Sequence, residues 1–282
     1  MTESITKEQL IQRLNEIATS GWFVSERGRN DGAVGNTLED LLGIEENNLP
    51  IPNAAEWELK AQRSTSNSLL TLCHMEPSPR ALSLVSRMLL PKYGWPHQGA
   101  GSTYGAHERS FRATLVGGGR TDRGFSVQVD EQNQRLVISF DASQVDGRHA
   151  LWLAEVQSAI GLGELNPQPY WGYRDLEHKM GTKLTNCFLV TAKSKRIDGI
   201  EHFWFNEAWM LSGFEFGLFV EALSRGDAYI DFDARSGHNH GTKFRIKKHA
   251  MRSLYANEQL LFRLTEEPPT ENSQLRFNKP EN

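Results

Sequence analysis

The sequence has little cysteine, no long apolar run and no large excess of charge of one sign. Its 282 residues include only two cysteines, Cys73 and Cys187, both in apolar stretches. We therefore expect buried free thiols in a reducing cytoplasm rather than a disulfide framework. No stretch approaches the ~18 consecutive apolar residues of a membrane-spanning helix. The segment Met1–Glu8 lacks the basic-then-apolar pattern of a signal peptide. Neither a membrane protein nor a disulfide-stapled secreted protein is expected.

The net charge of −4 hides an uneven distribution of charge along the chain. Residues 1–60 are rich in acid, whereas the segment Arg235–Arg252 holds six lysines or arginines and no acid. A basic segment on an otherwise acidic chain predicts contact with phosphate groups. The alternative is a solvated strand and helix face, which charge alone does not distinguish.

Residues 56–60 alternate charged and apolar side chains, as a strand with one buried face does. Trp57 and Leu59 then face a core. Glu56, Glu58 and Lys60 share the other face. A carboxylate and an ammonium in this arrangement can hold a divalent metal beside a phosphate or a water molecule, as phosphodiester hydrolysis requires. Most such triplets are solvated strand faces, so the surrounding sequence has to decide.

A predicted helix and a loop precede this strand. The helix is expected over residues 32–43, where an apolar stripe at helical spacing ends in a glycine. Glu39 lies near the polar edge of that stripe. The loop over residues 45–55 contains Asn53 and is rich in proline and asparagine. The order is therefore helix acid, loop, and then an acid-x-lysine strand.

The rest of the chain reads as a mixture of helices and strands. Further helices are expected at residues 6–20, 81–90, 149–160 and 206–224, the last of them long and aromatic. Strands are expected at residues 68–75, 110–116, 124–130, 134–140, 184–192 and 202–205, and a hairpin pairs residues 229–233 with 243–246.

The stretch 34–60, which holds Glu39, Glu58 and Lys60, resembles the PD-(D/E)xK nuclease superfamily. In detail it is similar to the MvaI/BcnI restriction endonucleases and their relative MutH, a nicking enzyme. The resemblance implies that Glu58 is a metal ligand and that Lys60 orients the attacking water and steadies the phosphate charge. Glu39 would hold the water network at the metal or the lysine. The implied cofactor is Mg²⁺, with Mn²⁺ as a substitute.

Two later segments extend the resemblance. Residues 179–190 look like a later core strand of these enzymes, where a second functional lysine, here Lys183, precedes a hydrophobic run. Residues 233–245 look like the C-terminal hairpin that reads DNA. The implied DNA-contacting residues are Arg235, His238, His240, Lys243 and Arg245, joined by the basic residues Lys247 and Lys248.

Asn53 departs from the family pattern. The family places an acidic metal ligand five residues before the Glu of Glu-x-Lys, and that position is Asn53 here. An amide oxygen can coordinate Mg²⁺ but brings no charge. Three interpretations stay open: an engineered Asp→Asn substitution, a natural site in which Glu56 or Glu39 supplies the charge, or a chain that binds DNA without cutting it.

The resemblance implies a mixed α/β fold of the restriction-endonuclease type, with a central sheet flanked by helices and two lobes around a DNA cleft. The expected division is a nuclease lobe (1–225), made of core segments 1–75 and 165–225 with a strand-rich insertion 76–164. A DNA-reading element and polar tail (226–282) would follow.

The implied function is that of a type II restriction endonuclease. Such an enzyme cuts double-stranded DNA with Mg²⁺, leaves 5′-phosphate ends, and acts as a monomer that nicks the strands in sequence. Its expected setting is the bacterial cytoplasm, with a cognate DNA methyltransferase as a functional rather than a physical partner. The alternatives are a MutH-like nicking enzyme and a sequence-specific DNA-binding protein without catalysis.

Overall fold

A computed structural model of the chain describes residues 5–26, 30–44 and 56–267. The chain forms two compact units, each of which is described by itself. Unit 1 comprises residues 1–70, 181–215 and 251–282, and unit 2 comprises residues 71–180 and 216–250. Three boundaries between the units fall inside β3 (Leu70–His74), α4 (Tyr173–Leu184) and α6 (Lys248–Met251).

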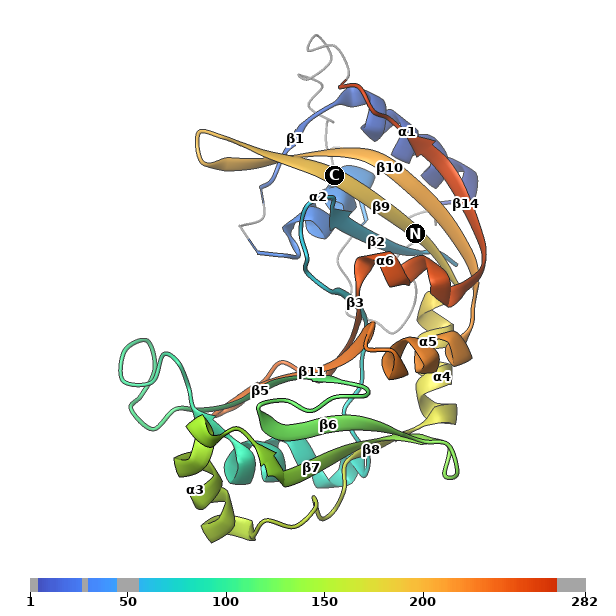
Figure 1. The fold of residues 1–282 in the computed structure, drawn as a ribbon. Helices are drawn as coiled ribbons and strands as arrows, with labels where there is room; N and C mark the ends of the chain where they lie inside the picture. Colours follow the sequence, from blue (N-terminus) through green and yellow to red (C-terminus); the bar gives the residue numbers. More distant parts are fainter. Residues whose placement is uncertain (1–4, 27–29, 45–55, 268–282) are drawn as a thin grey trace. The chain divides into compact units, whose positions relative to one another are not determined.

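Unit 1 is built on a mixed sheet (Figure 1). Its strands are β1 (Phe23–Val24), β2 (Glu58–Arg63), β9 (Asn186–Ile197), β10 (Ile200–Phe214) and β14 (Tyr255–Arg263). The order is β1-β10-β9-β2, and β14 also pairs with β10. Strand β2 runs parallel to β9, whereas the other pairs are antiparallel. Figure 1 shows β9, β10 and β14 side by side as long, curved strands.

Two helices pack on one face of this sheet. Helix α1 (Lys7–Ser20) starts at the N-cap Thr6, whose side chain and that of Gln9 form a reciprocal capping box. Helix α2 (Ala33–Leu42) ends at Gly43, which adopts a left-handed conformation. The core beneath them unites both helices with the sheet through Leu10, Leu14, Leu38, Leu42, Leu59, Phe188, Val190, Phe203 and Phe205. The opposite face of β2 is left for polar residues.

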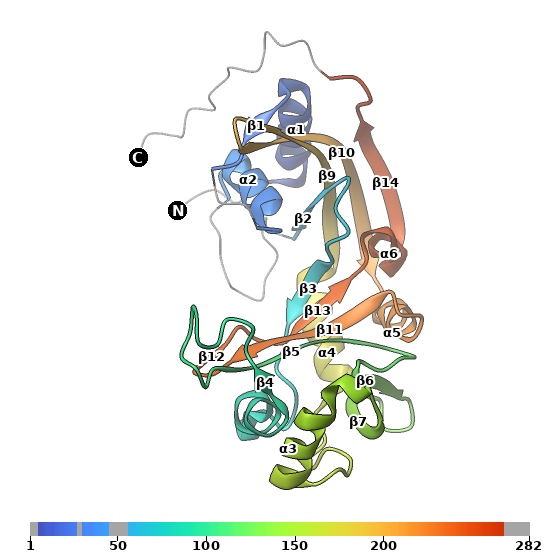
Figure 2. The same cartoon turned by 60° about the vertical axis from the view of Figure 1, so that its left-hand side comes forward.

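Unit 2 contains two sheets. The larger has the order β3-β13-β11-β5-β4, with β12 on β11, and the smaller has the order β6-β7-β8. Their strands are β4 (Trp95–Pro96), β5 (Arg109–Val116), β6 (Arg123–Asp130), β7 (Arg135–Val145), β8 (Tyr170–Gly172), β11 (Ala228–Arg235), β12 (His238–Asn239) and β13 (Lys243–Ile246). Figure 2 shows β5 and β11 running side by side, with β12 near one end.

The helices of unit 2 lie between these strands in the sequence. They are a π-helix over Val85–Tyr93, α3 (Ala150–Ile160) and α5 (Phe216–Ser224), with short 3-10 turns at Arg80–Leu82 and Gly147–His149. A further 3-10 turn in unit 1 spans Arg252–Leu254. The expected helix over residues 81–90 therefore exists, but it is wider than an α-helix and is shifted toward Tyr93.

The expected helix over residues 206–224 is wrong in its first half. Strand β10 continues to Phe214, and only Phe216–Ser224 is helical. The pairing of β10 with β9 shifts register between Phe205 and Glu207, which marks a β-bulge at Asn206. A bulge breaks the alternation of buried and exposed residues, and Phe203 through Asn206 are all buried. This strand therefore lacks the period of two that identifies strands in sequence.

Most other elements agree with expectation. The structure contains α1, α2, β2, β3, the strands β5 to β7, α3 and the hairpin of β11 and β13 close to their expected positions. The mixed α/β class is confirmed, and both cysteines are buried and form no disulfide. No helix within residues 5–26, 30–44 and 56–267 is long and apolar enough to span a membrane. The assignment of residues 1–225 and 226–282 to separate functional lobes stays a prediction.

The core of unit 1 generates a stability prediction. Leu38 lies on α2, is fully buried, and packs into the core that holds Leu59 in place. Leu38→Ala should therefore lower the free energy of unfolding by ~2–5 kcal/mol, because it leaves a cavity. Urea unfolding of the variant checks this, with Leu151→Ala as control because Leu151 is 86% exposed. Equal shifts for the two variants would contradict the assigned packing.

Candidate functional site

Glu58 and Lys60 form a close ion pair on the polar face of β2. Their side chains are brought together by the period of two along the strand, while Leu59 between them enters the core. The Lys60 Nζ lies 2.6 Å from the Glu58 Oε1. The Glu58 side chain is only 1% exposed, and that of Lys60 is 16% exposed. Burying a carboxylate this deeply is costly unless cationic partners lie beside it.

Lys183 is the second cation on the same carboxylate. Its Nζ lies 3.5 Å from the Glu58 Oε1. Lys183 sits in the last turn of α4, and the chain then enters β9, where Cys187 is the register partner of Glu58. The parallel pairing of β2 with β9 thus brings a lysine that is distant in sequence to the acid. Three residues singled out from the sequence meet at one point.

The second oxygen of Glu58 has a different environment. Glu58 Oε2 is buried and has no hydrogen-bond partner among the described residues. Leaving a buried acceptor unsatisfied costs ~1–3 kcal/mol, and more when the group is charged. A hard cation would satisfy this oxygen, because Mg²⁺ prefers carboxylate ligands. The orphaned oxygen therefore fits a metal ligand, although no group of three His, Cys, Asp or Glu side chains suited to a metal occurs within the described ranges.

Two ionisable groups near Glu58, the thiol of Cys187 and the hydroxyl of Tyr255, are uncharged. Burial raises the pKa of the Cys187 thiol to about 12, with nearby Lys60 opposing the shift and Glu58 adding to it. Burial also raises the pKa of Tyr255 well above its ordinary value, and Cys187 and Glu58 contribute further. Both groups are neutral at physiological pH. Cys187 therefore does not serve as a thiolate nucleophile, and the surroundings of Glu58 have a low polarity that strengthens its ion pairs.

The other predicted catalytic residues are placed less directly. Glu39 lies on α2, which contacts β2, but whether it reaches the metal-site water or a lysine stays a prediction. Glu56 is exposed in a turn just before β2. Asn53 lies outside the described residues.

The predicted DNA-reading hairpin in unit 2 has a charged face, on which basic side chains form ion pairs with acidic ones. Strand β11 buries Ala228, Ile230, Phe232 and Ala234 and turns its alternate side chains outward. Four of the basic residues each form an ion pair. The pairs are Arg235 with Glu108 at 3.1 Å, and Lys243 with Asp233, Arg245 with Asp231 and Lys247 with Asp227, each at 3.2 Å. Lys248 opens α6. Four cations of the basic segment are therefore paired with acids, which lie on β11 or directly before β5 and β11.

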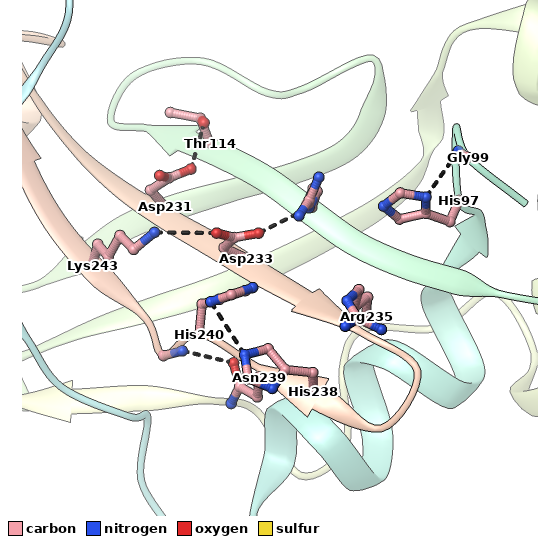
Figure 3. A network of polar contacts seen from close by, with 12 residues as sticks. His97, Gly99, Thr114, Asp231, Asp233, Arg235, His238, Asn239, His240 and Lys243 are labelled. Carbon is pink, nitrogen blue, oxygen red and sulfur yellow. Dashed lines mark hydrogen bonds and ion pairs between the residues drawn. The ribbon is translucent and has the colours of Figure 1, made fainter. Parts of the chain in front are cut away.

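His238 and His240 lie together at the turn of this hairpin (Figure 3). Their ring centroids are 4.1 Å apart, and the His238 Nε2 lies 3.3 Å from the His240 Nδ1. The following loop is held by a residue from the loop after β3, because Thr242 donates its backbone N–H and its hydroxyl to the Glu76 carboxylate, at 2.8 and 3.2 Å. The guanidinium of Arg235 stacks over Tyr104, at 4.7 Å from the ring centroid.

Sequence reasoning missed the partners of these residues. Asp227 lies directly before β11, and Asp231 and Asp233 lie on it at alternate positions, so this pattern was the available signal for a charged strand face. Glu76 and Glu108 come from distant segments and gave no signal. Gln62, two residues after Lys60 on β2, was also missed, although the same alternation places it beside the ion pair.

Comparison with known proteins identifies the family and supports the fold. The sequence pattern of the MvaI/BcnI restriction endonuclease family matches residues 11–255. A solved complex of restriction endonuclease MvaI with a cognate DNA substrate shares 22% identity and a TM-score of 0.72. The match covers 93% of this chain and 99% of that chain. Restriction endonuclease MvaI without DNA also matches, with 22% identity, a TM-score of 0.51, and coverage of 93% and 98%. No curated protein matches the chain.

These matches define the class of protein as a sequence-specific DNA endonuclease, a hydrolase of a type that generally uses a divalent metal. The chain belongs to the MvaI/BcnI restriction endonuclease family. The expected fold is likewise confirmed, with mixed sheets flanked by helices as in MvaI.

The paired face generates a prediction about pH. Burial opposes ionisation of Asp233, but the hydrogen bond and charge of Lys243, with Arg112 and His240 adding, hold its pKa below the usual 3.8. A depressed pKa contributes stability that is present above about pH 4 and is lost as the pH falls through the folded value. Asp233→Asn should therefore flatten the loss of stability between about pH 4 and pH 2.

Urea midpoints measured across that range test this expectation. The matched control is Asp175→Asn, because the Asp175 side chain is 62% exposed and lies 3.7 Å from its arginine partner. The control should keep the acid-side slope of the parent chain. A parental slope in Asp233→Asn would show that this carboxylate does not stabilise the fold.

Proposed function

We propose that this protein is a type II restriction endonuclease that hydrolyses double-stranded DNA with Mg²⁺ and leaves 5′-phosphate and 3′-hydroxyl ends. The observation that carries the proposal is the carboxylate of Glu58, buried at the edge of the sheet and held by Lys60 and Lys183. One carboxylate oxygen faces the two lysines, and the other has no partner among the described residues. A structural ion pair would not need an unsatisfied oxygen beside two ammonium groups.

The lysines supply positive charge where the reaction develops negative charge. An ammonium carries three donors, so Lys60 can hold Glu58 and, when DNA is bound, also donate to the attacking water. Lys183 adds a second cation at 3.5 Å from Glu58 and helps to stabilise the charge on the phosphorus oxygens. Glu39 would hold the lysine or the ordered water from α2.

The proposed metal ligands are Glu58, through Oε2, and Asn53. A bound Mg²⁺ supplies charge neutralisation at the phosphate and makes a coordinated water more acidic. The uncharged Asn53 weakens this site relative to a carboxylate. Mn²⁺ is expected to substitute for Mg²⁺, because both ions accept carboxylate and carbonyl oxygen ligands.

Double-stranded DNA is the proposed partner, and the solved MvaI complex, which contains a cognate DNA substrate, supports a DNA partner. Arg235, His238 and His240 would contact base edges, and Lys243 and Arg245 would support that contact. The lysines at positions 247 and 248 would contact phosphates. Because Lys243, Arg245 and Lys247 already pair with aspartates, DNA binding would exchange carboxylate partners for phosphates rather than use unpaired charge.

The described residues contain one proposed catalytic site, so a monomer would have to cut the two strands one after the other. We therefore propose a monomeric enzyme that passes through a nicked intermediate, works in the bacterial cytoplasm and depends on a cognate methyltransferase to protect host DNA. Asn53 favours one rival, a sequence-specific DNA-binding protein without catalysis. A MutH-like nicking enzyme is the other.

Digestion of supercoiled plasmid with Mg²⁺, and then with Mn²⁺, tests the function. We expect early nicked circles followed by discrete linear fragments. Lys60→Ala is the matched control and should cut ~10²–10⁴-fold more slowly while binding DNA within a few-fold of the parent, because Lys60 acts on the water. Nicked circles alone would support the MutH-like alternative. A gel shift without strand breaks would support the binding protein, and parental cleavage by Lys60→Ala would remove the proposed mechanism.

A separate prediction concerns Asn53. Asn53→Asp should raise the Mg²⁺-dependent cleavage rate by orders of magnitude, because the metal site gains a charged ligand. The measurement is the initial rate as a function of Mg²⁺ concentration, compared with Asn48→Asp as a charge-matched control in the same segment. Unchanged or lower activity would instead indicate a natural site completed by another acid, with Glu56 the next residue to test.

A further inference from the structure

Gln62 lies on the same face of β2 as Glu58 and Lys60. Its position follows from the strand period of two, which turns Leu59 and Ala61 toward the core of unit 1. On the neighbouring strand β9, its register partner is Thr191. Gln62 is partly exposed, so one side of its amide is within reach of solvent and of a bound substrate.

The two ends of this amide have different environments. The Gln62 Nε2 donates a hydrogen bond to the Thr191 Oγ1 at 3.1 Å, which fixes the orientation of the amide. The Gln62 Oε1 is buried and has no hydrogen-bond partner among the described residues. Buried acceptors in folded proteins nearly always have a hydrogen-bond donor. An acceptor without one beside a reactive group therefore indicates that a donor binds there together with the substrate.

The same strand face thus carries two buried acceptor oxygens without a hydrogen-bond partner among the described residues, one on each side of Lys60. Glu58 Oε2 is a carboxylate oxygen and suits a metal ion. Gln62 Oε1 is a neutral amide oxygen and suits an N–H or O–H donor. Phosphate oxygens of DNA are acceptors, so the DNA backbone cannot donate a hydrogen bond to the Gln62 Oε1. A water molecule can donate one.

The attacking water needs such an acceptor. Lys60 can only donate, so it binds the lone pairs of the water and not its protons. Glu58 Oε1 is already shared by the two lysines. Of the three polar side chains that β2 turns to this face, Gln62 therefore offers the neutral acceptor that could take a proton of the water in a hydrogen bond.

We propose that Gln62 is a catalytic residue of the hydrolysis, and that its Oε1 accepts a hydrogen bond from the attacking water while Thr191 positions the amide. This inference rests on the proposed nuclease function. The water oxygen forms the bond to phosphorus, the bond from phosphorus to the 3′ oxygen breaks, and the proton of the water passes to solvent. The 3′ oxygen takes a proton from solvent, and Gln62 stays neutral throughout.

The test compares two replacements of nearly equal size. Gln62→Met removes the acceptor oxygen. Gln62→Glu keeps an acceptor oxygen, and its carboxylate can also accept a hydrogen bond from the Thr191 hydroxyl, which keeps the side chain in position. Cleavage of a short duplex is measured under single-turnover conditions, with duplex affinity measured separately in Ca²⁺. The parent is the form of the chain that cleaves, either wild type or Asn53→Asp.

We expect Gln62→Met to lose ~10²-fold in rate, because the water is no longer oriented for in-line attack. Affinity for the duplex should stay within about twofold. Gln62→Glu should retain clearly more activity than Gln62→Met. Thr191→Val should lose a smaller factor, because the amide is freed, and Thr191→Ser should recover that loss.

Three outcomes would overturn the inference. The first is a cleavage rate of Gln62→Met equal to that of the active parent. The second is equal loss in Gln62→Met and Gln62→Glu with matching losses of thermal stability, which would assign Gln62 to folding alone. The third is a loss of affinity that accounts for the whole loss of rate, which would make Gln62 a DNA contact. If neither parent cleaves, the proposed function fails as well, so the two failures are distinguishable.

Discussion

The burial of one carboxylate is the constraint on which the arrangement of unit 1 depends. Glu58 is 1% exposed on β2, and a lone charge at that depth would cost far more than folding can offset. It is held by Lys60 from its own strand and by Lys183 from α4. The second of these cations reaches Glu58 only when the α4–β9 segment packs beside β2. The fold and the reactive group are stabilised by the same contacts.

This constraint explains which parts of the site could be predicted from the sequence. Glu58 and Lys60 are neighbours because a strand alternates, so their meeting follows from local pattern alone. Lys183 meets them only through the parallel pairing of β2 with β9, and composition or spacing does not encode that pairing. Its prediction came from family resemblance. Gln62 was within reach of the same alternation, but an uncharged amide does not stand out without its contacts.

The fold shows the same division between local and non-local information. Helix α1 was predictable because its cap and its apolar stripe are encoded within a few residues, and α2 because its stripe ends at a glycine. Strand β10 was not predictable beyond Phe205. A bulge and pairing with strands on both sides make its residues buried without alternation, and aromatic side chains then resemble a buried helix. Long-range pairing overrides local pattern where a strand lies inside a sheet.

The charged face of unit 2 extends this argument to electrostatics. The sequence shows a run of cations, but aspartates on β11 or directly before it pair with three of them, so net charge along the chain does not measure available charge in space. Exchanging a carboxylate partner for a phosphate changes the Coulomb energy of each cation little. The displaced carboxylates then either repel the phosphates or accept hydrogen bonds from the amino groups of bases. If this face contacts DNA as proposed, it would gain little from random DNA. It would bind well only where every displaced carboxylate finds a donor, and that requirement would make a neutral face selective.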